Sequence, residues 1–67
     1  MRARVRNPEE GDIFVQDLDG KEMTLSPYGE YESLGLCEKT YHQVIMRTVD
    51  QHIFIAQSID FEIKEEI

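Results

Sequence analysis

The sequence predicts an all-β or β-rich fold, in which about five antiparallel strands form a small, partly open barrel or bent sheet. Three observations support this fold class. Apolar residues recur with the two-residue period of a strand near both ends, over 2–6 and over 53–63, where only Gln57 breaks the pattern. An Asp19-Gly20 pair separates two apolar runs, as in a β-hairpin. The chain has 67 residues without a repeat or a linker, so we expect a single domain over 1–67.

The first strands follow from residue type. Residues 2–6 alternate arginine with apolar residues, which predicts a strand with Ala3 and Val5 on its inner face. Residues 7–11 contain a proline and a glycine and predict a turn. Residues 12–18 are rich in β-branched and aromatic side chains and predict the next strand.

The Asp-Gly turn leaves two registers to compare. A two-residue loop would set Asp17 directly opposite Glu22, and like charges in that position are unfavourable. A four-residue loop over 17–20 avoids this contact and pairs Gln16 with Lys21. We therefore expect the four-residue loop.

The stretch from 26 to 38 is the least regular part of the chain. Pro27, Gly29 and Gly35 interrupt it. We expect a long connection here, with at most one helical turn near 30–34. Connections of this length in small domains often carry function.

The last third of the chain carries the strongest strand pattern. We expect 39–49 to fold back on 52–63 around Asp50-Gln51, with 53–63 as one long, bent strand. Asp-Gln is a poor pair for a tight turn, so a loop that is one or two residues longer is the alternative. This register gives the hairpin two apolar faces. One face holds Val44, Met46, Ile53, Ile55, Ile59, Phe61 and Ile63. The other face, which we expect to be free for self-association, holds Tyr41, Ile45, Phe54 and Ala56.

The two ends of the chain carry opposite charges. Antiparallel pairing of the first and last strands would join these charges and hide one edge of the sheet. The expected partners are Arg2, Arg4 and Arg6 on one strand and Glu62, Glu65 or Glu66 on the other.

The charge balance restricts the class of partner. Seven Lys and Arg stand against fourteen Asp and Glu, giving a net charge of -7. Such a surface repels phosphate, so we do not expect a nucleic acid partner, whereas a basic protein surface would fit. There is no apolar run of about 18 residues and no charged-then-apolar leader, and the single cysteine suits a reducing compartment. We therefore expect a soluble cytoplasmic protein that does not contact a membrane.

Chemistry-bearing residues are few. Cys37, His42 and His52 could in principle form a nucleophile with a base or a metal site, but the two histidines fall on opposite faces of the expected hairpin. Neither phosphate-binding nor dinucleotide-binding glycine motifs occur. The acidic residues around Asp17 lack the spacing of a calcium loop. We therefore expect no enzymatic activity, no cofactor and no metal.

The leading functional hypothesis is a non-catalytic protein-binding module, such as an inhibitor or accessory factor. Tyrosine is common at interfaces because it combines apolar area with a polar end. The expected anchor patch with an acidic rim consists of Tyr28, Glu30, Tyr31, Glu32, Leu34 and Leu36. The alternative is that these residues fold back and cover one open face of the sheet. In size and charge the chain resembles phage and mobile-element accessory proteins that occupy a basic cleft of a host protein.

Two alternatives remain open from sequence. Residues 30–47 loosely resemble an irregular helix-turn-helix, which would make the chain a small DNA-binding transcription regulator. The second apolar face of the hairpin would instead suit a structural subunit of a homo-oligomer.

Overall fold

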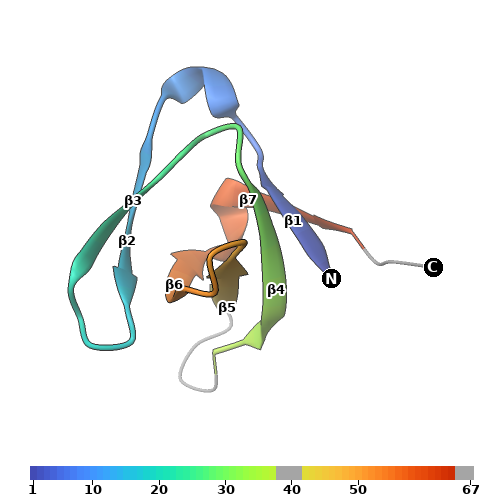
Figure 1. Cartoon of the computed structure of the whole chain (residues 1–67). Helices are drawn as coiled ribbons and strands as arrows, with labels where there is room; N and C mark the ends of the chain where they lie inside the picture. The colour runs from blue at the N-terminus through green and yellow to red at the C-terminus, as the bar shows by residue number, and fades with distance from the viewer. Residues whose placement is uncertain (38–41, 65–67) are drawn as a thin grey trace.

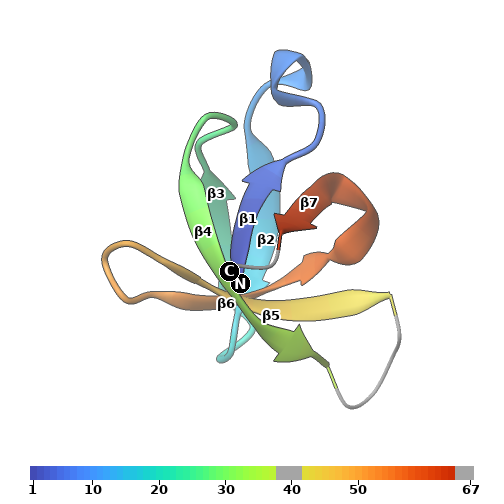
Figure 2. The ribbon, with the colours of Figure 1, turned by 90° about the vertical axis from the view of Figure 1, so that its right-hand side faces the viewer.

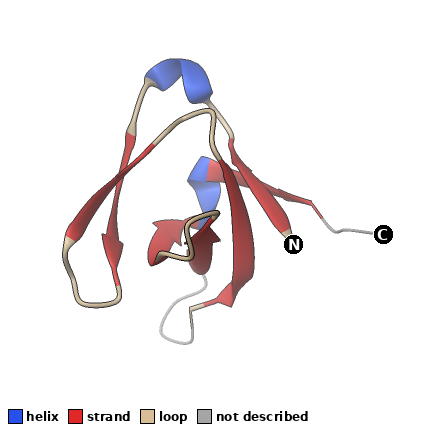
Figure 3. Ribbon diagram, in the orientation of Figure 1, coloured by secondary structure: helices blue, strands red, loops and turns tan. Residues whose placement is uncertain are grey.

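The computed structural model describes residues 1–37 and 42–64, and these residues form an all-β sheet structure (Figures 1 and 3). The predicted class is confirmed, with seven antiparallel strands among the described residues instead of about five. Two single-turn 3-10 helices, η1 and η2, interrupt the strands. In chain order the elements are β1 (Arg2–Val5), η1 (Pro8–Glu10), β2 (Ile13–Asp17), β3 (Glu22–Leu25), β4 (Glu30–Leu36), β5 (Gln43–Thr48), β6 (Ile53–Gln57), η2 (Ser58–Asp60) and β7 (Phe61–Lys64).

The strands lie in the order β3-β2-β6-β5-β4-β1-β7, and the sheet is not closed into a barrel. It bends around the core, so that β2 and β3 stand across from β1 and β4, as Figures 1 and 2 show. The predicted pairing of the first and last strands is confirmed, because β1 runs antiparallel to β7 with Arg4 opposite Glu62. Glu65 and Glu66 lie outside the described residues.

The core lies on the concave side of this bent sheet. Ala3 and Val5 point inward from β1, as their alternation with arginine predicts. The buried side chains are Ala3, Val5, Val15, Leu25, Tyr31, Val44, Met46, Phe54, Ala56 and Phe61. No helix within the described residues is long and apolar enough to cross a bilayer.

The predicted faces of the β5–β6 hairpin are wrong. Phe54 and Ala56 were expected on an outer face with Ile45, but both are buried opposite Met46 and Val44. The turn has three residues, one more than Asp50-Gln51 and within the longer loop expected as the alternative, because Thr48 N donates to His52 O (2.9 Å). A shift of one residue in register moves every side chain of one strand to the other face. Tyr41 of the same expected face lies outside the described residues.

The β2–β3 hairpin differs from the prediction by one residue as well. Gln16 lies opposite Glu22, not Lys21. Three residues form the loop, since Asp17 N donates to Lys21 O (2.8 Å). The carboxylate of Asp17 also accepts hydrogen bonds from the backbone N–H groups of Asp19 and Lys21 (both 2.9 Å). Such local capping by aspartate stabilises a tight turn.

Residues 53–63 form two strands instead of the single long strand that we predicted. β6 ends at Gln57, η2 turns the chain, and β7 begins at Phe61. β6 lies between β5 and β2, whereas β7 pairs only with β1 at the end of the sheet. The apolar alternation continues through the corner, which is why the sequence pattern did not reveal it.

Residues 30–36 correct two expectations. They form β4, not a connection with a helical turn. A helix-turn-helix over 30–47 is also wrong for the described part of this range, since 43–48 form β5. Gly35, which we interpreted as a breaker, has φ +125° and lies at a register shift between β4 and β5. A β-bulge at glycine allows the strand to continue through this position.

Candidate functional site

Tyr28 lies in a turn between β3 and β4 that several hydrogen bonds to Ser26 stabilise. Gly29 N donates to Ser26 O (3.3 Å), and Tyr28 N donates to the Ser26 hydroxyl oxygen (3.3 Å). Tyr31 Oη donates a shorter hydrogen bond to the same Ser26 carbonyl (2.6 Å). The side chain of Tyr28 is 77% exposed. The turn therefore presents an aromatic side chain to solvent from a fixed backbone, as the predicted anchor patch requires at this position.

Tyr31 does not fit the role predicted for it. Its side chain is only 7% exposed and makes edge-to-face contacts with Phe54 and Phe61, with ring centroids 5.7 and 5.9 Å away. Burial raises the pKa of the Tyr31 hydroxyl, and the negative charge of Asp12 raises it further. Tyr31 therefore supports the turn from the core and cannot contact a partner directly.

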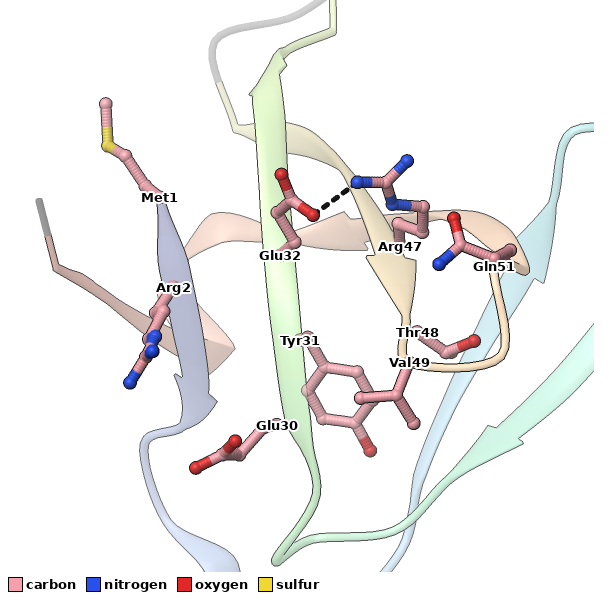
Figure 4. Close-up of a pocket in the computed structure, with 9 residues that line it drawn as sticks. All are labelled: Met1, Arg2, Glu30, Tyr31, Glu32, Arg47, Thr48, Val49 and Gln51. Carbon is pink, nitrogen blue, oxygen red and sulfur yellow. Dashed lines mark hydrogen bonds and ion pairs between the residues drawn. The ribbon is translucent and has the colours of Figure 1, made fainter. Parts of the chain in front are cut away.

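Glu30 and Glu32 are exposed, and each lies near a cationic side chain of a neighbouring strand. Figure 4 shows the pair that Glu32 forms with Arg47. The Arg47 guanidinium donates a hydrogen bond to Glu32 Oε2, and this bond and the charge of Arg47 hold the pKa of Glu32 below its usual value. Arg4 Nη2 lies 3.8 Å from Glu30 Oε1. These two carboxylates therefore form part of a balanced charged surface on β4, β1 and β5.

Leu34 and Leu36 are exposed, at 44% and 61%, but they lie at the other end of β4 from Tyr28. A strand rises about 3.3 Å per residue, so the two ends of β4 are roughly 20 Å apart. The six predicted residues therefore do not form one patch, and Tyr28 and the two leucines belong to separate surfaces.

Described residues of the sheet line two open cavities. The larger, about 410 Å³, is shown in Figure 4 and has two arginines and two glutamates in its wall, so it concentrates neither sign of charge. Its lining residues are Met1, Arg2, Glu30, Tyr31, Glu32, Arg47, Thr48, Val49 and Gln51. The smaller, about 350 Å³, lies beside the point where the β2–β6 ladder ends at Gln16 and Ile55.

Most of the excess negative charge lies in one segment, residues 7–29, which we call the acidic arm. It comprises η1, β2, β3 and the adjoining turns. One cation, Lys21, stands against six carboxylates, so the arm carries -5 of the net -7. The carboxylates are Glu9, Glu10, Asp12, Asp17, Asp19 and Glu22.

The acidic arm also exposes large apolar side chains. Phe14 is 66% exposed, and Leu18 and Tyr28 are exposed as well. Figures 1 and 2 show η1 and the turn that carries Tyr28 at the same end of the molecule. The exposure of Phe14 was not predicted, although the high density of carboxylates over 7–29 is evident from the sequence.

Cys37, His42 and His52 do not converge on one site. His42 and His52 flank opposite ends of β5, and Cys37 follows β4. Across residues 1–37 and 42–64, no group of three or more His, Cys, Asp or Glu side chains is arranged to hold a metal ion. Cys37 N donates to Gln43 O (3.0 Å), which places Cys37 at the end of β5 that His42 precedes, whereas His52 lies at the other end.

Comparison with known proteins gives no match to a protein family, a curated protein or a solved structure. The functional argument therefore rests on charge, exposure and geometry.

Proposed function

We propose that this chain is a non-catalytic, cytoplasmic protein-binding module that docks on a basic surface of its partner, as an inhibitor or accessory factor would. The observation that carries the proposal is the acidic arm, which combines a charge of -5 with exposed Phe14, Leu18 and Tyr28. Exposed aromatic side chains within a charged rim are typical of protein interfaces.

The distribution of charge supports the acidic arm as the contact surface. On β4, β1 and β7 the charges of both signs are balanced. Arg4 lies opposite both Glu30 and Glu62, and Arg2 lies opposite Glu32 on one side and Lys64 on the other. No comparable set of cations accompanies the arm, where Lys21 is the one positive side chain. A surface of one sign accelerates association with an oppositely charged partner, and salt screens this effect.

Salt-dependent capture with two matched variants tests the proposal. The arm variant is Glu10→Gln with Asp19→Asn, and the control is Asp60→Asn with Glu62→Gln, which removes the same charge from η2 and β7. We expect the wild-type chain to retain a basic partner from a cell lysate at low salt and to release it at high salt. The arm variant should retain less, and the control should match the wild type. Equal retention at both salt concentrations, or equal loss in both variants, would contradict the proposal.

A structural subunit of a homo-oligomer is the second candidate. Half-buried Ile45, Ile53 and Ile55 lie on the face of β5 and β6 that points away from the core, with Ile45 opposite Ile55. This row would become buried if a second copy covered it. Sedimentation of the wild-type chain distinguishes this candidate, because a discrete oligomer that Ile55→Ser dissociates would favour it.

A further inference from the structure

We infer that the free edge of β3 binds an extended segment of the partner in which cationic side chains alternate with apolar ones, adding that segment to the sheet as a further strand. This inference deepens the proposed function and rests on it, because it specifies how the acidic arm engages a basic protein. Addition of a strand to a sheet edge is an established mode of peptide recognition.

The free backbone N–H and C=O groups of β3 point outward from the sheet, as the addition of a strand requires. Asp17 N donates to Lys21 O, and hydrogen-bonded pairs alternate along an antiparallel ladder. The register of β2 and β3 therefore turns the N–H and C=O groups of Glu22 and Thr24 away from β2. Within the described residues, no backbone hydrogen bond outside the ladders involves either residue. Both residues present their peptide groups at the end of the sheet.

The opposite edge of the sheet, β7, is less open. Arg6 N donates to Asp60 O (2.9 Å), so the ladder turns the peptide groups of Phe61 outward. Those groups already have partners, since Phe61 N donates to Ser58 O and the Arg6 guanidinium donates to Phe61 O (3.1 Å). Ile63 is the remaining outward position on β7. Of the two ends of the sheet, β3 therefore offers the longer free edge.

The core is incompletely covered beside β3. Ile13 and Met23 are apolar side chains that pack against the core but stay partly exposed, and both belong to the β2–β3 hairpin. An added strand would place one set of alternating side chains next to Met23, on the inner face. Apolar residues at those positions would complete the burial of this margin and gain the favourable transfer of apolar surface from water.

The outward-facing side chains of β3 favour cationic side chains on an added strand. Glu22 and Thr24 are exposed there, and Thr24 lies opposite Phe14 on β2. Outward side chains of an added strand would lie beside Glu22 within the acidic arm, where opposite charges across neighbouring strands are favourable. A second copy of β3 would bring another acidic arm to this place, so charge disfavours self-pairing.

The molecule contains the same pairing internally. β1 alternates arginine with small apolar residues and runs antiparallel to β4, which alternates glutamate with a buried side chain. Arg4 lies opposite Glu30, while Ala3 lies opposite Tyr31 on the inner face. A basic and apolar strand therefore pairs with an acidic strand of this protein in the same arrangement that we infer for β3.

Proline substitution tests the inference because it removes an outward N–H without breaking the neighbouring ladder. Thr24→Pro blocks the β3 edge, and Ile63→Pro is the matched control on β7. The probe is a short, end-blocked synthetic peptide in which arginine alternates with valine, measured by fluorescence anisotropy. We expect Thr24→Pro to weaken peptide binding about tenfold or more, from lost backbone hydrogen bonds and strand contacts, and Ile63→Pro to leave it unchanged. Circular dichroism melts establish that both variants fold, and a Glu22→Arg variant offers a second test that leaves the backbone unchanged.

Amide hydrogen exchange of the full chain locates the bound peptide. New protection at Glu22 and Thr24 supports the inference. Equal weakening by the two proline variants, protection confined to other strands, or dimerisation through β3 without peptide would overturn it. Failure of the proposed function has a different signature, because the arm variant Glu10→Gln with Asp19→Asn would then retain the basic partner as well as wild type does. Partner capture that is salt-sensitive but unaffected by Thr24→Pro would preserve the proposed function and reject the β3 edge.

Discussion

Gly29→Ala should destabilise the protein through a steric conflict with Tyr31. A Cβ atom at position 29 would lie 2.5 Å from Tyr31 Oη and 2.9 Å from Tyr31 Cζ. The ring cannot move aside freely, because it is buried between Phe54 and Phe61 and its hydroxyl donates to Ser26 O. Overpacking typically costs about 1–3 kcal/mol and a lost hydrogen bond about 1 kcal/mol, so we expect a total of at least about 2 kcal/mol.

Thermal unfolding followed by circular dichroism measures this effect. For a domain of this size, about 2 kcal/mol lowers Tm by roughly 8–16 °C. Tyr31→Phe removes the oxygen that the new methyl group meets first, so Gly29→Ala should cost about 1 kcal/mol less in a Tyr31→Phe background. An unchanged Tm for Gly29→Ala, or the same loss in both backgrounds, would refute the steric explanation.

Three further predictions follow from the turns, the ion pair and the corrected hairpin register. Gln51 has a left-handed φ of 72°, so Gln51→Gly should raise the free energy of unfolding by about 0.5–1 kcal/mol in urea denaturation. Arg47 lowers the pKa of Glu32 in the folded protein below its ordinary value of 4.5. This ion pair therefore stabilises the folded state above pH 4.5, and the stabilisation is lost as the pH falls through the lowered pKa of the folded state. In thermal melts at decreasing pH, the Tm values of wild type and Glu32→Gln should therefore converge, and a difference in Tm that stays constant with pH would contradict this. Phe54→Ala should cost about 3–5 kcal/mol and Ile45→Ala clearly less, whereas the register expected from sequence, which places both side chains on the outer face, predicts a small cost for both in the same denaturation assay.

The fold class and the pairing of the chain ends followed from sequence because they depend on alternation and charge, which are local features. The register of both hairpins did not. In β5 and β6 both faces are apolar, with Val44 and Met46 on one face and Ile45 on the other, so burial could not select between them. The choice depended on the turn, where Gln51 adopts a backbone conformation that favours glycine.

The candidate site was predictable only in part. Tyr28, a member of the predicted anchor patch, is exposed, because a turn with proline and glycine presents the residue between them. Tyr31 was placed wrongly because Gly35 was interpreted as a break, so the alternation of Glu30, Tyr31 and Glu32 was not interpreted as a strand. Phe14 lies on the outer face of β2, which no other element of the described residues covers. The sequence of one strand does not indicate which of its faces will be covered by other elements, so the exposure of Phe14 could not be predicted.

The corner at η2 has a consequence for the order of folding. It carries the chain from β6, in the middle of the sheet, to β7 at its end, where Phe61 fills the core against Tyr31. During synthesis on the ribosome, β1 therefore cannot pair with β7 until residues 61–64 have been made. Until then we expect the apolar side chains of β1 to stay incompletely covered. Pairings between residues so distant in sequence form slowly, in milliseconds to seconds for small β proteins. The net negative charge, which keeps incomplete chains apart by repulsion, is then as useful before folding as after it.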